Sequence, residues 1–238
     1  TPALILDLDS FERNVARMAD ALRGTSVRLR PHAKSHKCAE IALRQMAAGA
    51  VGVCCQKVSE AEALVAGGVS DVLISNEIVG AGKLERLAAL ARTAKLAICV
   101  DAAENVVDVD AAAERAGVRL DVLVEVNVGG NRCGAEPGAP ALALARAIAD
   151  SRNLRFAGLQ AYQGSAQHVR TVADRREAIG LSVERVRSTR ELIQRNGIPC
   201  ETVTGGGTGS FPVELASGTY DELQPGSYIF MDADYNRN

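Results

Sequence analysis

Residues 30–38 read "RPHAKSHKC" and hold two histidines and two lysines at the end of a predicted buried strand. Lys34 and His32 are two residues apart, and near a strand end this spacing can direct both side chains the same way. An ammonium group that faces the inside of a fold loses hydration, which lowers its pKa towards the neutral amine that forms a Schiff base. Lys34 is therefore a candidate covalent amine, and a solvated lysine at the start of a loop is the alternative.

The histidines around this lysine are candidates to orient groups or relay protons, because imidazole titrates near neutral pH. His32 is near enough to Lys34 to tune its amine, whereas His36 serves either the substrate or only the fold. His168 is a weaker candidate, since a single histidine in a polar loop is usually solvated. We carry Lys34, His32 and His36 forward as candidate catalytic residues, with no base assigned among the histidines. Lys37 is expected on the following helix, facing solvent or a neighbouring carboxylate.

Two later predicted strands end in polar loops that contain glycine. The loop in "EVNVGGNRCG" turns at Gly129 and Gly130 and presents Arg132. The rigid donor fork of an arginine suits a phenolate, carboxylate or phosphate oxygen, and an exposed loop arginine is the alternative interpretation. The loop in "LQAYQGSAQH" presents Tyr162 at the next strand end.

The last two predicted strands are followed by loops that could bind an anion. In "TVTGGGTGS", the backbone N–H groups around Gly206 and Gly207 can converge on a phosphate, with the Thr208 hydroxyl beside them. In "LQPGSYIFMDADY", Gly226 and Ser227 offer further backbone amides. An amine, an arginine and a phosphate cradle are together what pyridoxal phosphate needs from a protein.

The strands and helices that position these residues are predicted from the spacing of hydrophobic residues along the chain. Short β-branched runs alternate with Ala-, Leu-, Arg- and Glu-rich segments of helical spacing, which predicts a parallel (β/α)8 barrel over residues 1–238. An open doubly wound sheet is the alternative, although its GxGxxG signature is absent. No helix is predicted in "GSFPVELASGTYD", and an additional strand is expected over residues 1–7, in the run "ALILDLD". The eight predicted barrel strands cover residues 27–32, 51–55, 71–75, 95–101, 121–127, 156–162, 201–204 and 222–230.

The amino-acid composition argues against nucleic acids and membranes as binding partners. The 238 residues are 47% hydrophobic with a formal net charge of -2, which lacks the basic footprint of a nucleic-acid-binding protein or of a membrane-surface helix. No apolar run approaches the roughly 20 residues of a membrane span. The six cysteines form no CxxC pair, so we expect reduced thiols in a cytoplasmic protein that binds a small molecule.

The "PHAKSHK" lysine, the "NRCG" arginine, the "GGGTGS" loop and "QPGSYIFMDADY" resemble, in this order, the alanine-racemase-like pyridoxal phosphate enzymes. The resemblance is to the D-threonine aldolase and D-serine dehydratase group, and "VGVCCQKVSEAEA" and "QAYQGSAQH" are most similar to the 3-hydroxyaspartate aldolases. It implies that Lys34 carries the cofactor as a Schiff base and that Arg132 contacts its phenolic oxygen, with Tyr162 also at the cofactor. The phosphate would then be held by the loop residues Gly206, Gly207, Thr208, Gly226 and Ser227.

This chain differs from the family in two respects. In the racemases an arginine faces the pyridine nitrogen, and Gln224 stands at that position here, so no charge is supplied to the ring. The group has a second, β-rich domain that supplies ligands for a divalent metal (Mg²⁺ or Mn²⁺), and the strand expected over residues 1–7 would pair with it. We therefore expect no metal ligands in this chain, which starts at Thr1 and stops within "YNRN" as an excerpt of a longer polypeptide would. A homodimer is also expected.

The implied reaction is retro-aldol cleavage of a D-configured β-hydroxy amino acid, with 3-hydroxyaspartate giving glycine and glyoxylate. Lys57 or Arg170 would bind the second carboxylate of that substrate. D-threonine cleavage and dehydration of D-serine or D-threo-3-hydroxyaspartate are the alternatives within the group. A non-catalytic protein of pyridoxal phosphate homeostasis is the alternative of another class, since those proteins share the barrel and lack the second domain.

Overall fold

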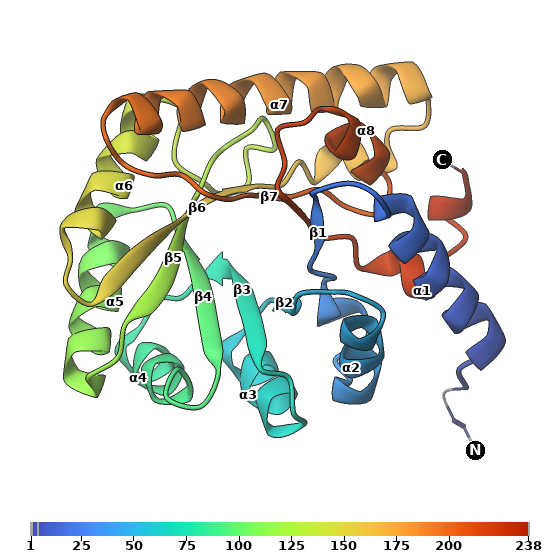
Figure 1. The fold of residues 1–238 in the computed structure, drawn as a ribbon, viewed down its shortest axis with the longest axis horizontal. Coiled ribbons are helices and arrows are strands. Elements are labelled where there is room, and N and C mark those ends of the chain that lie inside the picture. Colours follow the sequence, from blue (N-terminus) through green and yellow to red (C-terminus); the bar gives the residue numbers. More distant parts are fainter. Residues whose placement is uncertain (1, 4, 238) are drawn as a thin grey trace.

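The computed structural model describes residues 2–3 and 5–237 and confirms the barrel prediction (Figure 1). In the part of the chain that is described, eight parallel strands alternate with eight α-helices, and the helices lie outside the strands. None of these helices is long and apolar enough to cross a membrane. The elements in chain order are α1 (Leu8–Leu22), β1 (Arg28–Leu29), α2 (Ala39–Ala47), β2 (Val53–Cys55), α3 (Val58–Ala66), β3 (Asp71–Glu77), α4 (Ala81–Leu90), β4 (Lys95–Val100), α5 (Ala103–Ala116), β5 (Leu120–Glu125), α6 (Ala139–Asp150), β6 (Leu154–Ala161), α7 (Val172–Arg195), β7 (Val203–Gly205), α8 (Phe211–Ala216) and β8 (Glu222–Leu223).

The sheet closes between its first two strands. The strand order is β1-β8-β7-β6-β5-β4-β3-β2, so β1 and β2 stand at the two ends of the ladder. Two backbone hydrogen bonds join these ends, from Val51 N to Leu29 O at 2.9 Å and from Cys54 N to Pro31 O at 2.8 Å. A parallel bridge between His32 and Cys54 continues the pairing. Because every strand is parallel, the carboxyl ends of all eight strands face one rim, where barrel enzymes carry their chemistry.

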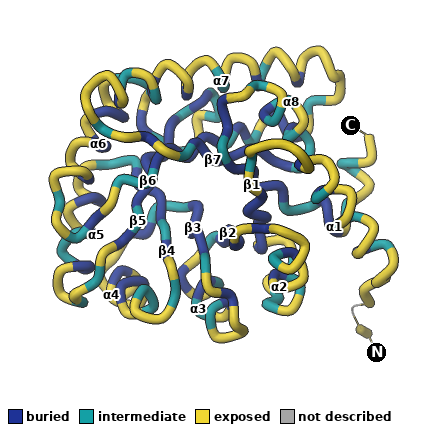
Figure 2. Tube along the Cα trace, in the orientation of Figure 1, coloured by how far each residue is buried: buried dark blue, intermediate teal, exposed yellow. Residues whose placement is uncertain are grey.

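The core has two layers. Aliphatic side chains fill the space between strands and helices, and Figure 2 shows the buried strands at the centre with exposed residues on the outer faces of the helices. Inside the barrel, a smaller cluster consists of Cys54, Leu73, Cys99 and Leu123. All six cysteines of the chain are free thiols, as expected from their spacing.

A buried ionic cluster occupies the opposite end of the barrel, where β3, β4 and β8 begin. Arg30 donates to Glu222 Oε1 at 2.9 Å and to Asp71 Oδ1 at 2.6 Å. Lys95 Nζ lies 2.9 Å from the second oxygen of Asp71. The Arg30 and Glu222 side chains are only 9% and 5% exposed, so each depends on the other for compensation of its charge.

Several predicted elements differ from the structure. Phe211–Ala216 is a helix, where none was predicted, and Pro212 fits its first turn because proline is tolerated where no intrahelical N–H bond is made. The last strand ends at Leu223, since Ser227–Ile229 forms a 3₁₀ turn. Lys37 is exposed and lies 3.4 Å from Glu60, as expected, but it precedes α2 with φ 53°.

The strand expected over residues 1–7 is not found in the described part of that range. Residues 2–3 and 5–7 form no strand, and residues 1 and 4 lie outside the described residues. Asp7 instead caps α1, its side chain accepting from Ser10 N at 2.8 Å. Pairing of this segment with a second domain stays a prediction.

Replacing Arg30 by leucine should lower the free energy of unfolding by about 3–5 kcal/mol, because Glu222 and Asp71 would lose the cation between them. Urea denaturation at neutral pH measures this change. Arg23→Leu is the control, since Arg23 pairs with Asp20 on the exposed face of α1 and should have little effect. Equal stability of the two variants would contradict the structural role of the cluster.

Candidate active site

One pocket opens at the carboxyl rim of the barrel. It contains every residue that the sequence predicted for cofactor binding, together with His32. His36 lies outside it, in a neighbouring apolar groove with Ile41 and Phe230. The pocket is lined by His32, Lys34, Ser35, Gln56, Ser75, Arg132, Gln160, Tyr162, Gly206, Gly207, Thr208, Gln224, Gly226, Ser227 and Tyr235.

Lys34 stands on the 3₁₀ turn Ala33–Ser35, directly after the first barrel strand. Its side chain keeps access to solvent through the open pocket, and its Nζ lies 5.9 Å from the centroid of the Tyr162 ring. The protein that surrounds the amine lowers its pKa, first by desolvation and then by the positive charge of Arg132. Both effects favour the neutral amine that a Schiff base requires.

His32 holds this turn as a neutral ring. Its Nδ1 accepts from Lys34 N at 3.3 Å, so the proton of the neutral ring is on Nε2, which lies 3.1 Å from Ser75 Oγ. Burial, followed by the charges of Lys34 and Arg132, lowers its pKa to about 3. Both ring nitrogens are therefore engaged, and the arrangement suits a positioning role better than proton relay.

Arg132 and Tyr162 form one wall of the pocket. The guanidinium carbon of Arg132 lies 5.3 Å from the centroid of the Tyr162 ring, within cation–π range. Burial, and next the neighbouring Tyr235, raises the pKa of Tyr162 to about 12, so its hydroxyl stays protonated. Arg132 Nη2 lies 3.5 Å from Glu125 Oε1, at the end of β5.

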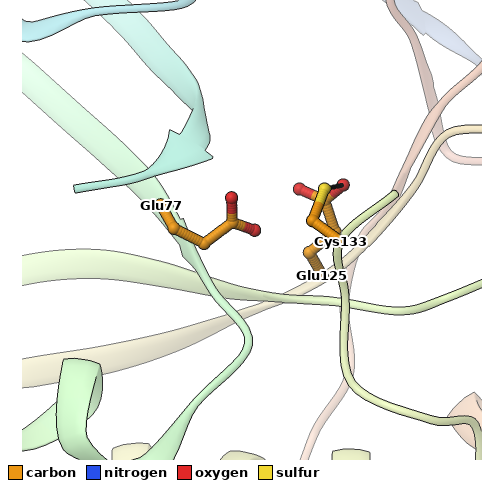
Figure 3. Close-up of side chains that lie close together, drawn as sticks. All are labelled: Glu77, Glu125 and Cys133. Carbon is orange, nitrogen blue, oxygen red and sulfur yellow. Dashed lines mark hydrogen bonds between the residues drawn. The ribbon is translucent and has the colours of Figure 1, made fainter. Parts of the chain in front are cut away.

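Behind Arg132 lies a cluster of Glu77, Glu125 and Cys133 that the sequence analysis missed (Figure 3). The Cys133 thiol donates to Glu125 Oε1 at 3.0 Å. Burial and the Glu125 charge raise the pKa of Glu77 to about 7. One ligand atom from each residue lies within 4.8 Å of the others, which is a geometry a metal ion could use. The cluster faces the Arg132 guanidinium, and burial together with the Glu125 charge favours the protonated form of Glu77.

The glycine loop after β7 forms an anion cradle. Gly206 has φ 73°, which favours glycine, and a Cβ at Gly207 would lie 2.3 Å from Gln167 Oε1, so a side chain there would displace the Gln167 amide. Thr208 Oγ1 is buried without a hydrogen-bond partner, and a phosphate oxygen would satisfy it. On the opposite side, a Cβ at Gly226 would lie 2.8 Å from the His32 carbonyl oxygen. These features fit a phosphate group.

The pocket floor is made of neutral amides. Gln224 Nε2 donates to Gln160 Oε1 and to Thr204 Oγ1, both at 2.8 Å, and Gln160 Nε2 donates back to Gln224 Oε1 at 3.1 Å. Thr204 Oγ1 in turn donates to Glu222 at 3.0 Å. Gln160 was not predicted, although it lies on β6 two residues before Tyr162, which directly follows the strand, and so points to the same side.

Lys57 and Arg170, the cations predicted for a second substrate carboxylate, do not line the pocket. Lys57 is exposed at the start of α3, and Arg170 forms an ion pair with Asp234. His168 also holds Asp234, with its Nδ1 2.6 Å from the carboxylate, and its ring lies against that of Tyr235 at 5.3 Å between centroids. This contact brings Tyr235 to the pocket mouth, which sequence spacing alone does not indicate.

Comparison with known proteins places this geometry in a family. The model of the alanine racemase N-terminal domain matches residues 6–234. The chain belongs to this family. It is 53% identical to D-threonine aldolase of Arthrobacter sp. and 45% identical to 3-hydroxy-D-aspartate aldolase of Paracoccus denitrificans (strain Pd 1222). Each alignment covers 100% of this chain and 63% or 62% of the relative, so the chain spans less than two thirds of these relatives.

A solved structure supports the same placement. D-threonine aldolase from Filomicrobium marinum superimposes with a TM-score of 0.98 at 57% sequence identity. The superposition covers 100% of this chain and 64% of that chain. The barrel described here therefore corresponds to one part of a longer homologous protein.

Replacing Arg132 by leucine should raise the pKa of Lys34, because a positive charge that disfavours the ammonium form is removed. Competitive acetylation followed by mass spectrometry measures the titration midpoint of Lys34, with the exposed Lys83 as the internal reference. Arg44→Leu is the matched control, since Arg44 pairs with Glu12 outside the pocket and should leave the midpoint in place. The same midpoint in all three proteins would show that Arg132 does not act on the amine.

Proposed function

We propose that this chain binds pyridoxal 5'-phosphate through Lys34 and takes part in cleaving the Cα–Cβ bond of D-configured β-hydroxy amino acids. The observation that carries the proposal is the convergence of a lysine with a lowered pKa and an unpartnered Thr208 hydroxyl in one pocket. The relatives support the reaction class, because their names describe aldolases acting on such amino acids.

The residues of this chain would divide the work as follows. The glycine loop and Thr208 hold the phosphate, and Lys34 supplies the amine for the cofactor's carbonyl carbon. Arg132 offers its donor fork to the phenolic oxygen, and Gln224 and Gln160 present neutral amides from the floor. Bound pyridoxal phosphate supplies the electron sink for a carbanion at the substrate Cα.

Two substrates remain candidates within this class. Our sequence-based proposal is 3-hydroxyaspartate, which would yield glycine and glyoxylate. Among the described residues that line the pocket, the cations are Lys34 and Arg132, and both are assigned to the cofactor. Unless a part of the protein outside this chain supplies a further cation, this observation favours a substrate with an uncharged side chain, such as D-threonine.

Further parts of the proposal lie beyond these residues. We propose that a divalent metal, Mg²⁺ or Mn²⁺, is held by the part of the homologous proteins that this chain does not span. Such an ion would acidify the substrate β-hydroxyl. A homodimer and a cytoplasmic location stay predictions.

The full-length protein should convert D-threonine to glycine and acetaldehyde, or D-3-hydroxyaspartate to glycine and glyoxylate. Lys34→Ala should abolish both the product and the visible absorbance of the bound cofactor, because no other pocket lysine is present among the described residues. Chromatography of the products against added standards measures the outcome. Oxaloacetate or 2-oxobutanoate as sole product would instead show dehydration, and cofactor binding without turnover would support the homeostasis protein.

A further inference from the structure

A buried carboxyl group lies behind the glycine loop, and the proposed function does not use it. Glu214, on α8, is only 1% exposed. Its Oε1 accepts from Ser210 Oγ at 2.7 Å, whereas its Oε2 is buried without a partner. A carboxylate with one donor and no cation is costly to bury, so the protonated form is favoured. Burial raises the pKa of Glu214 to about 7.

This carboxyl fixes the direction of the hydrogen bonds under the loop. Ser210 has one hydroxyl proton and gives it to Glu214, so its oxygen must accept from its other neighbours. It accepts from Gln167 Nε2 at 2.7 Å and from Gly207 N at 3.4 Å. With its amide nitrogen committed, Gln167 turns its Oε1 to Gly209 N at 3.0 Å. The amides of Gly207 and Gly209 are thus held from behind the pocket.

Thr208 stands between these two supported glycines. Its Oγ1 is the buried, unpartnered donor that we assign to phosphate. The carboxyl lies directly behind the loop, because a Cβ at Gly206 would be 3.5 Å from Glu214 Oε1. A phosphate dianion in the cradle would therefore lie close to Glu214 across a single layer of backbone.

Glu214 has no ion pair among the described residues, and no cation is among the groups that shift its pKa. Tyr162 and Tyr220 interact with it, and burial raises the pKa of both tyrosines, so they stay protonated. Two charged groups on elements packed against α8 are engaged elsewhere: Arg190 of α7 pairs with Asp221, and Glu222 of β8 pairs with Arg30.

We propose that Glu214 is a positioning residue for phosphate, which holds the Gly207–Ser210 loop through Ser210 and Gln167 and carries a proton whenever a phosphate dianion occupies that loop. The inference rests on the proposed function in that the ligand is a phosphate ester bound in this pocket. The carboxylate form of Glu214 repels the dianion, so binding at a pH above the pKa of Glu214 in the ligand-free protein takes up a proton. Below that pKa the Glu214 carboxyl is already neutral, and binding proceeds without proton uptake.

The sign of the pH dependence follows from this linkage. Phosphate-specific affinity is full below about pH 7 and falls as the pH rises above it, by at most tenfold per pH unit. Glutamine is a matched substitute for the neutral acid, because its oxygen can accept from Ser210 and it cannot ionise. Glu214→Gln should therefore keep the loop in place and remove the pH dependence.

The experiment compares pyridoxal 5'-phosphate with pyridoxal, which has the same aldehyde but no phosphate. Dissociation constants of both probes are measured by absorbance titration of the cofactor-free, full-length protein at pH 6.5 and pH 8.0. The ratio of the two constants isolates the phosphate contribution, because the titration of Lys34 affects both probes. Ionisation of the phosphate itself affects wild type and variant alike, so it cancels between the two proteins.

In wild type, the ratio of the pyridoxal dissociation constant to that of pyridoxal phosphate should fall roughly five- to tenfold from pH 6.5 to pH 8.0. In Glu214→Gln the same ratio should change by less than about twofold. Glu77→Gln is the control. Glu77 also has a pKa raised to about 7 but lies behind Arg132, so this variant should behave as wild type. Parallel pH profiles for wild type and Glu214→Gln would overturn the inference, as would a wild-type ratio that is independent of pH.

A second measurement keeps the test decisive if Glu214→Gln does not fold. In weakly buffered solution at pH 7.5, an indicator dye should show that wild type takes up more protons with pyridoxal phosphate than with pyridoxal, and no excess would overturn the inference. If pyridoxal phosphate does not bind wild type at all, the proposed function fails as well. Binding without the pH signature overturns only the role of Glu214.

Discussion

Closure of the barrel between β1 and β2 is the constraint on which the site depends. The hydrogen bonds from Val51 and Cys54 to the first strand fix the direction in which the chain leaves at Pro31. The turn that carries Lys34 follows at once, and His32 ties it to Ser75 on β3. The loop after β8 then packs against this turn, at a distance that only glycine permits at Gly226. The amine and one half of the phosphate cradle are therefore placed by the same closure.

The charged groups of the barrel lie at its two ends, and the uncharged amides of the pocket floor lie between them. At the end opposite the pocket, Arg30 and Lys95 neutralise Glu222 and Asp71. A chain of hydrogen bonds runs from Glu222 through Thr204 to Gln224. It orients the Gln224 amide at the pocket floor but brings no charge there. Lys34 and Arg132 carry the positive charge of the rim, which suits an anionic ligand.

Three carboxyl groups lie behind the walls of the pocket, and their charges are compensated in two ways. Glu125 faces the Arg132 guanidinium and accepts from the Cys133 thiol. Glu77 and Glu214 have pKa values raised to about 7, chiefly by burial, and so exchange protons in the physiological range. Of these two, Glu214 lies behind the glycine loop and Glu77 lies behind Arg132, so only Glu214 is placed to respond to a phosphate in the loop.

The sequence predicted the barrel and most of the residues that line the pocket because both rest on local patterns. The strands read as short β-branched apolar runs, and Lys34, Arg132 and Thr208 each follow such a run within a polar or glycine-rich loop. The cluster of Glu77 and Glu125 was missed because it brings together the ends of β3 and β5, which lie on either side of β4 and far apart in the sequence. A register shift between Ile74 and Glu77 also extends β3 beyond its predicted end at Ser75.

The positions of three other residues could not be predicted from the sequence, for equally physical reasons. His36 lies two residues beyond Lys34, but the 3₁₀ turn directs it to the apolar groove. Tyr235 reaches the pocket through a long-range contact between Asp234 and His168, which no local pattern encodes. Glu214 is buried on a helix too short for its period to be recognised.

The most direct test of the account is to locate the covalent bond. The full-length protein is loaded with pyridoxal 5'-phosphate and reduced with borohydride, and its peptides are then sequenced by mass spectrometry. The account predicts one phosphopyridoxyl group, on Lys34. A label on Lys37, Lys57 or another lysine instead, or no label at all, would contradict it.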